Sequence, residues 1–190
     1  MVIVEIGIKL KKDFNYYDRI LKNKGFDNDF NVQTHDIYYT NKNLDGLSEN
    51  EMKNSCIRLR SCNNSPFNVQ NNLLKELNIK EVSFDDLIEF EKRLLKFEYK
   101  KIFDTFKLDH HYYKNEMNRK IQLQEINDIG LVVYYDNSFY YGLPLEEQRR
   151  KLIEELNSYG FDEFDYDTLG LDKLRTLYYK KECYSQNQNG

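Results

Sequence analysis

The sequence predicts an α+β domain whose sheet is mainly antiparallel. Segments that alternate polar and apolar residues outnumber segments with helical spacing, and few gaps between them are long enough for a crossover helix. The 190 residues contain no internal repeat and no Pro- or Gly-rich linker. We therefore expect one domain over residues 1–184, followed by a polar tail at 185–190 that frays.

The first two elements are a strand and a helix. Residues 2–10 place apolar side chains at even positions, which predicts a strand with one apolar and one polar face. Asp13 can then cap a helix, because apolar residues from Phe14 to Leu21 recur with three-to-four spacing. Gly25 is a natural end for this helix.

The middle of the chain combines short strands with polar connections. We expect strands at residues 33–40, 56–60 and 73–82, a polar loop at 41–54, a turn at 63–66 and a helix at 84–95. Alternation in the second of these strands places Arg58 and Arg60 on the same face.

The last third begins with a long hairpin. We expect its strands at residues 97–113 and 119–124, then a strand at 131–141, a helix from Pro144 to Gly160 and a final helix at 171–181. His110 and His111 are neighbours on the first hairpin strand, so they point to opposite faces and cannot both bind one metal ion.

Charge and composition exclude several classes of protein. Lys and Arg number 28 against 32 Asp and Glu, so the net charge of -4 gives no general attraction to nucleic acid or to an anionic membrane. No apolar run approaches membrane-spanning length. The 3 cysteines lack metal-ligand spacing, which favours reduced thiols. We expect a soluble cytoplasmic protein with no nucleic acid or membrane partner.

Four short motifs, taken in order, carry a family resemblance. They are Glu5-Ile6-Gly7-Ile8-Lys9, Asp36 with Tyr38 and Tyr39, Arg58-Leu59-Arg60, and the segment from Leu123-Gln124-Glu125-Ile126 to Tyr134-Tyr135-Asp136. Together they resemble the CYTH superfamily, the triphosphate tunnel proteins that include class IV adenylate cyclases and thiamine triphosphatases. The resemblance covers roughly residues 2 to 140. It implies a closed or nearly closed eight-stranded antiparallel β-barrel, a tunnel with flanking helices and charged side chains inside.

The resemblance also implies a site. Its phosphate-binding residues would be Lys9, Arg58, Arg60, Lys107 and Lys75, and its metal ligands would be Glu5, Asp136 and Glu76. Glu5, Lys9 and Asp136 would be catalytic, with Mg²⁺ or Mn²⁺ on the phosphates of a small-molecule tri- or polyphosphate.

Part of the family pattern is replaced here. Gly7, Gln124 and Tyr134 stand where the family has carboxylates, and Asp109 stands where a second basic residue would follow Lys107. Glu125 is a nearby acid. The expected function is binding of a triphosphate-containing ligand by a metal-dependent triphosphatase weakened by these losses. A non-catalytic phosphate-binding module and a class IV-type adenylate cyclase are the alternatives, and a homodimer is left open.

Overall fold

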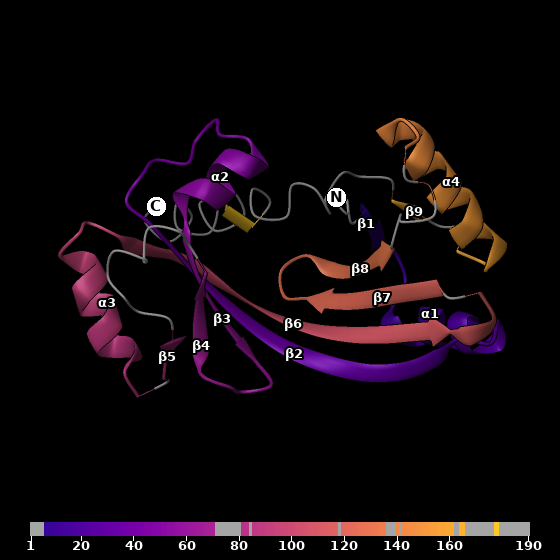
Figure 1. Cartoon of the computed structure of the whole chain (residues 1–190), viewed down its shortest axis with the longest axis horizontal. Coiled ribbons are helices and arrows are strands. Elements are labelled where there is room, and N and C mark those ends of the chain that lie inside the picture. Colours follow the sequence, from indigo (N-terminus) through magenta and orange to yellow (C-terminus); the bar gives the residue numbers. More distant parts are fainter. Residues whose placement is uncertain are drawn as a thin grey trace, which may run out of the picture. The chain divides into compact units, whose positions relative to one another are not determined.

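The computed structural model of the chain describes residues 6–70, 81–83, 85–117, 119–135, 140, 142–161, 164–165 and 177–178. Helices and strands alternate irregularly along it (Figure 1). In chain order they are β1 Ile6–Leu10, α1 Phe14–Asn23, β2 Asp27–Thr40, α2 Glu49–Ser55, β3 Ile57–Cys62, β4 Phe67–Gln70, β5 Glu81–Val82, α3 Leu87–Leu95, β6 Lys100–Lys114, β7 Arg119–Ile126, β8 Gly130–Tyr135, α4 Leu145–Ser158 and β9 Phe164–Asp165.

The strands hydrogen-bond in the order β5-β4-β3-β2-β6-β7-β8-β1-β9. The pairs β1–β8, β2–β3 and β7–β8 are antiparallel, as are β1–β9, β3–β4 and β4–β5. The α+β class with an antiparallel sheet is therefore confirmed. The closed barrel is not confirmed, because the order of the described strands starts at β5 and ends at β9.

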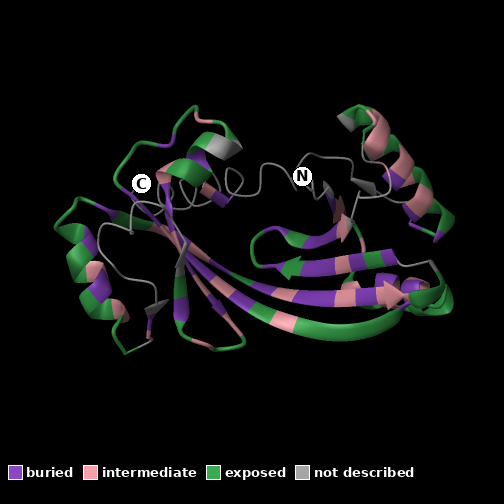
Figure 2. Ribbon diagram, in the orientation of Figure 1, coloured by how far each residue is buried: buried purple, intermediate pink, exposed green. Residues whose placement is uncertain are grey.

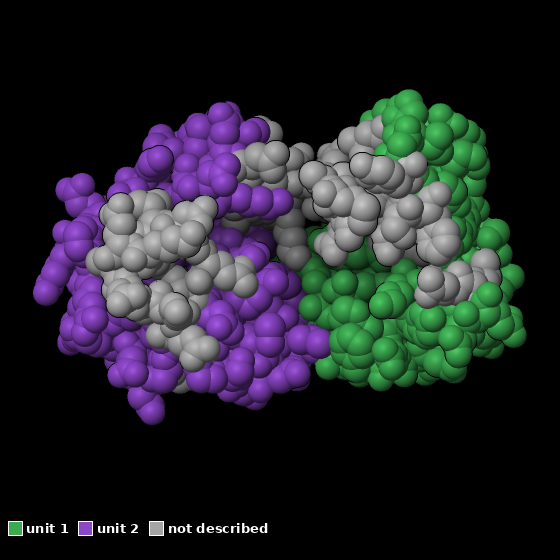
Figure 3. Space-filling view, in the orientation of Figure 1, with its two compact units in different colours: residues 1–31, 108–171 green, residues 32–107, 172–190 purple. Residues whose placement is uncertain are grey.

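The chain forms two compact units, which are coloured separately in Figure 3. Unit 1 comprises residues 1–31 and 108–171, and unit 2 comprises residues 32–107 and 172–190. The unit boundaries fall within β2 and β6, so each of these long strands contributes one part to either unit. The single domain expected over residues 1–184 stays a prediction.

The core of unit 1 lies between its strands and the helices α1 and α4. It is built by the apolar residues of β1, β7 and β8 together with one face of each helix, among them Ile8, Leu10, Leu21, Leu123, Val133, Leu152 and Leu156. The side chain of Asp13 caps α1 by accepting a hydrogen bond from the Tyr16 backbone N–H at 2.9 Å. The predicted strand and capped helix at this end of the chain are thus confirmed for the described residues.

The core of unit 2 lies against α3. It contains Ile37, Tyr39, Ile57, Leu59, Phe67, Val82, Phe90, Leu94 and Tyr99. Strand β3 alternates buried and half-buried residues along its whole length, and Figure 2 shows similar alternation along β6. Because Ile57 and Leu59 point into this core, Arg58 and Arg60 necessarily point to the opposite face of the sheet.

Residues 41–54, predicted as a polar loop, contain helix α2 in their second half. Ser48 and Glu51 form a capping box, in which each side chain accepts a hydrogen bond from the backbone N–H of the other residue. Buried Met52 anchors the helix. The prediction was wrong because the run of Asn, Asp, Gly and Ser outweighed the capping signature.

Three other sequence expectations need correction or stay open. Strand β4 was not predicted, and β2 begins at Asp27 instead of residue 33. The strand expected at residues 73–82 and the helix expected at 171–181 fall largely outside the described residues. None of the described helices combines the length and the apolar character needed to cross a membrane.

Candidate functional site

Four charged residues of unit 2 meet on one face of the sheet, and we name them the charged cluster: Asp36, Arg58, Arg60 and Lys107. The register of β2 and β3 sets Asp36 directly opposite Arg60 and Tyr38 directly opposite Arg58. Lys107 comes from β6. The alternation that buries Ile57 and Leu59 on the other face therefore also assembles this cluster.

Asp36 is the centre of the cluster. Its carboxylate accepts from Arg60 Nε at 2.6 Å and from Arg60 Nη2 at 2.7 Å, a two-pronged arrangement that suits the planar guanidinium. The ammonium of Lys107 also donates to Asp36 Oδ2. The side chain of Asp36 is 0% exposed and that of Lys107 is 2% exposed, whereas that of Arg60 is 30% exposed.

The protonation of these groups follows from their contacts. Burial alone would raise the pKa of Asp36, but the hydrogen bonds and charges of Arg60 and Lys107 outweigh it and hold that pKa well below its usual range. Burial lowers the pKa of Lys107, and the neighbouring arginines add to this, while Asp36 opposes it. Three cations against one carboxylate leave the cluster with two positive charges.

Tyr38 and Thr105 extend the same face beside the cluster. Burial raises the pKa of Tyr38 to about 12, and Arg58 hydrogen-bonds to it. The Tyr38 ring packs on Phe103 with ring centroids 4.9 Å apart. Thr105 lies between Phe103 and Lys107 on this face of β6, and its buried hydroxyl has no hydrogen-bond partner among the described residues. An unpaired buried hydroxyl is unfavourable unless something outside these residues satisfies it.

Unit 1 holds the positions where carboxylates were expected. Gly7 of β1 is directly opposite Tyr134 of β8, and Tyr134 is in turn opposite Gln122 of β7. Lys9 and Gln124 are both opposite Val132. We name Gly7, Tyr134, Gln122 and Gln124 the neutral row, because they share one face of β1, β8 and β7 and carry no charge.

Two other acids of unit 1 are already engaged. The Gln124 side chain donates a hydrogen bond to buried Asp109. Glu125 lies 2.9 Å from His110 Nε2, so it points away from the face that carries Gln124. His111 instead stacks on Phe30. The prediction that the two histidines face opposite ways is consistent with these contacts, whereas Glu125 does not join the neutral row as a nearby acid.

The remaining predicted site residues are Glu5, Lys75, Glu76 and Asp136, which lie outside the described residues. Within the described ranges, no group of three or more His, Cys, Asp or Glu side chains is placed to hold a metal ion. Because all three predicted metal ligands lie outside the described residues, the Mg²⁺ or Mn²⁺ site stays a prediction.

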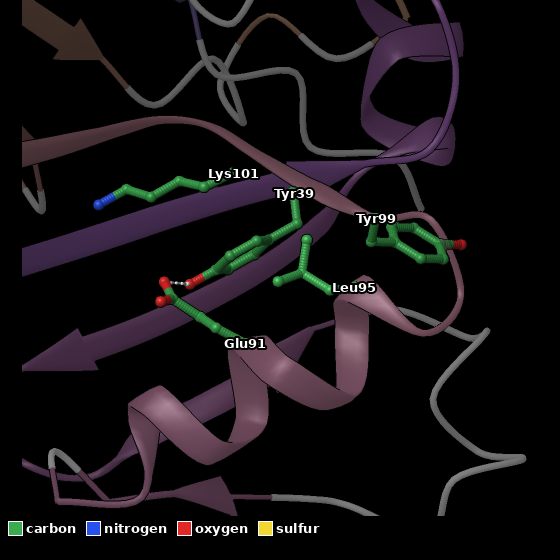
Figure 4. Close-up of a pocket in the computed structure, with 5 residues that line it drawn as sticks. All are labelled: Tyr39, Glu91, Leu95, Tyr99 and Lys101. Carbon is green, nitrogen blue, oxygen red and sulfur yellow. Dashed lines mark hydrogen bonds between the residues drawn. The ribbon is translucent and has the colours of Figure 1, made fainter.

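A separate pocket of unit 2 lies beside α3 (Figure 4). It has a volume of about 160 Å³ and is lined by Tyr39, Glu91, Leu95, Tyr99 and Lys101. The Tyr39 hydroxyl donates to Glu91 at 2.8 Å, and burial together with Glu91 raises the pKa of Tyr39. Tyr39 and Tyr38 are consecutive strand residues, so this pocket faces away from the charged cluster.

The sequence predicted the arginines and Lys107 but not the role of Asp36, Tyr38 or Thr105. The sequence identified Asp36 as part of a motif but not its ion pair with Arg60, because that pair depends on the register between two strands separated by a long connection. Thr105 carried a weaker signal, because it precedes Lys107 by two residues and therefore shares its face.

Comparisons with known proteins were made for sequence and for structure. No family model matches the sequence, and no curated protein is significantly similar to it. The chain is similar to the PH1819 protein of Pyrococcus horikoshii, with a TM-score of 0.51 and 16% identity over 90% of this chain and 99% of that chain.

Two further solved structures are similar to the same extent. The PH1012 protein of Pyrococcus horikoshii has a TM-score of 0.53 and 18% identity, over 88% of this chain and 99% of that chain. A proposed adenylate cyclase from Vibrio parahaemolyticus has a TM-score of 0.50 and 13% identity, over 86% of this chain and 92% of that chain. At 13–18% identity, these likenesses concern the fold of the chain alone.

Proposed function

We propose that the chain binds a small molecule containing a tri- or polyphosphate, and that the charged cluster is its phosphate-binding site. One observation carries this proposal: Arg58, Arg60 and Lys107 converge on one sheet face with Asp36, so these four residues together carry a net formal charge of two positive units. Holding such charges partly out of water is unfavourable, and a multiply charged anion would relieve it.

The geometry of the cluster suits phosphate oxygens. Arg60 is partly exposed, and its guanidinium has donors beyond the two that Asp36 occupies. Arg58 is half-buried on the same face. The hydroxyl of Thr105 offers a neutral donor for the same ligand. Lys9 belongs to unit 1, and Lys75 lies outside the described residues, so their part in phosphate binding stays a prediction.

Hydrolysis of the bound triphosphate with Mg²⁺ or Mn²⁺ is the extension that the CYTH resemblance implies. Such an ion would neutralise phosphate charge when bound. It would depend on Glu5, Asp136 and Glu76, because the neutral row offers no carboxylate. We derive no catalytic step from the described residues, and we place the phosphate-binding module ahead of the triphosphatase and of the cyclase.

Binding is tested by isothermal titration and thermal shift with tripolyphosphate, ATP and thiamine triphosphate, each with and without Mg²⁺ or Mn²⁺. We expect Arg58→Gln to weaken tripolyphosphate binding about tenfold, since a charged hydrogen bond contributes about 1.5 kcal/mol or more. Arg93→Gln is the control, because Arg93 is an exposed residue of α3 whose guanidinium pairs with Glu89 of the same helix at 3.8 Å.

The same samples are assayed for release of phosphate and for formation of cyclic AMP. Ligand stabilisation without turnover supports the binding module, whereas metal-dependent phosphate release establishes the triphosphatase. Absence of stabilisation by all three ligands contradicts the proposal.

A further inference from the structure

The charged cluster contains its own anion. Asp36 occupies two donors of Arg60 and accepts from Lys107, so a carboxylate of the protein makes the contacts that a phosphate oxygen would otherwise make. Carboxylate and phosphate oxygens compete for the same fork of donors, because guanidinium geometry suits both.

Burial makes this internal pair strong. The Asp36 side chain is completely buried, and the pKa of Asp36 is held low enough that it stays ionised throughout the neutral range. Its negative charge is therefore present whenever the ligand arrives, and it opposes the ligand charge across a partly dehydrated face.

We propose that Asp36 is a built-in counter-anion that lowers the phosphate affinity of the charged cluster and restricts the site to ligands with several negative charges. This inference rests on the proposed phosphate-binding function. With Asp36 ionised the cluster has two positive charges, and without that ionised group it has three. A ligand with few negative charges gains little binding free energy from the cluster while Asp36 is paired with Arg60 and Lys107.

The counter-anion also explains how Arg60 and Lys107 are kept together in the absence of ligand. Removing one partner of a buried ion pair leaves the other charge uncompensated, which favours unfolding. Asp36 thus stabilises the unliganded fold and weakens the complex with phosphate.

The test compares Asp36→Asn with wild type by titration of tripolyphosphate, pyrophosphate and inorganic phosphate. Asn has nearly the same shape as Asp, but it removes the negative charge and replaces one acceptor oxygen by an NH2 donor. We expect the Kd for tripolyphosphate to fall at least tenfold and inorganic phosphate to bind measurably, while the Tm of the unliganded variant falls.

Asp18→Asn is the matched control. Asp18 is a partly buried acid that accepts a hydrogen bond from Tyr112 and pairs with Lys22, and its substitution changes the net charge by the same amount as Asp36→Asn. We expect the Kd of Asp18→Asn for tripolyphosphate to equal that of wild type. If both variants bind tripolyphosphate more tightly, net charge explains the higher affinity and the inference is contradicted.

A second measurement uses wild-type protein, in case Asp36→Asn does not fold. The ¹³C resonance of the Asp36 carboxyl is followed by NMR during titration with tripolyphosphate, and we expect it to shift as the ligand draws Arg60 and Lys107 away. A resonance unchanged at saturation contradicts the inference, as does an equal or weaker Kd for folded Asp36→Asn. If wild type and Asp36→Asn both fail to bind any phosphate, the proposed function itself is contradicted.

Discussion

The charged cluster of unit 2 and the neutral row of unit 1 are two different arrangements of polar residues on a sheet face. In the cluster, Asp36 keeps Arg60 and Lys107 charged by pairing with both. In the neutral row, the side chains themselves carry no charge: Gly7 lies opposite Tyr134 across the strands, and Gln124 donates a hydrogen bond to the buried carboxylate of Asp109. A sheet face thus holds several cations where it also supplies an anion, whereas neutral side chains need only hydrogen-bond partners.

The largest expected effect comes from breaking the charged cluster at Arg60. Arg60→Ala leaves the fully buried carboxylate of Asp36 with Lys107 alone, so we expect the free energy of unfolding to fall by about 3 kcal/mol. Urea unfolding at neutral pH measures this loss. Arg93→Ala, an exposed arginine on α3, should cost less than about 0.5 kcal/mol. An equally small loss for Arg60→Ala would mean that the pair with Asp36 contributes little.

Acidification should remove the same stabilisation in wild type. The folded-state pKa of Asp36 lies below its unfolded value, so the stability it contributes is fully present above about pH 4 and is lost as the pH falls toward the folded pKa. The contribution is on the order of 2 kcal/mol.

Urea unfolding of wild type and Asp36→Asn across this range tests the sign. We expect their stabilities to differ at neutral pH and to approach each other progressively as the pH falls from about 4 toward the folded pKa, because protonation and the Asn substitution remove the same charge. Curves that stay parallel down to low pH would show that Asp36 is not the titrating group.

Restoring carboxylates to the neutral row should create metal dependence in unit 1. Gly7→Glu with Tyr134→Glu places two carboxylates directly opposite each other, so we expect a lower Tm without metal because like charges repel. Mn²⁺ at a concentration ten times its Kd for the variant should raise the free energy of unfolding by about 1.4 kcal/mol.

Thermal shift with and without Mn²⁺ measures this recovery. The pair Asn15→Glu and Asn157→Glu, both on exposed helix positions, adds the same charge without bringing the carboxylates together. If the two double variants respond to Mn²⁺ equally, the neutral row is not a metal position.

The smallest expected effect concerns the hydroxyl of Thr105. Thr105→Val should leave the unliganded stability unchanged or slightly higher, because the hydroxyl has no partner among the described residues. The same change should weaken tripolyphosphate binding by about 1 kcal/mol, roughly fivefold.

Thr40→Val is the matched control for Thr105→Val. The Thr40 hydroxyl donates to the Ser55 carbonyl at 2.9 Å, so this variant should lose about 1 kcal/mol of stability and keep its phosphate Kd. Tripolyphosphate binding that is unaffected by Thr105→Val would remove Thr105 from the site.

Sequence patterns were sufficient where the interactions are local. Alternation predicted β1 and β3, and three-to-four spacing with Asp13 and Pro144 predicted α1 and α4. The start of β2 was missed because residues 27–31 are exposed and, apart from Phe30, polar, so the strand there depends on pairing with its neighbours and not on burial.

The candidate site depended on contacts that no local pattern reveals. The arginines of β3 could be assigned to one face from their spacing, but the register that sets Arg60 against Asp36 is a property of two strands distant in sequence. The opposition of Gly7 and Tyr134 likewise requires the first strand to pair with one more than 120 residues later. Until that pairing is known, Gly7 and Tyr134 cannot be recognised as parts of one neutral position on the sheet.

The division of β2 and β6 between the units has a consequence for the order of folding. Unit 1 joins residues 1–31 to residues 108–171. During synthesis, its first strand and helix therefore cannot pack against the rest of the unit until most of the chain has been made. The charged cluster lies entirely between residues 36 and 107 of unit 2, and its contacts close shorter loops. On the ribosome, the paired charges can therefore assemble before the core of unit 1 has been made.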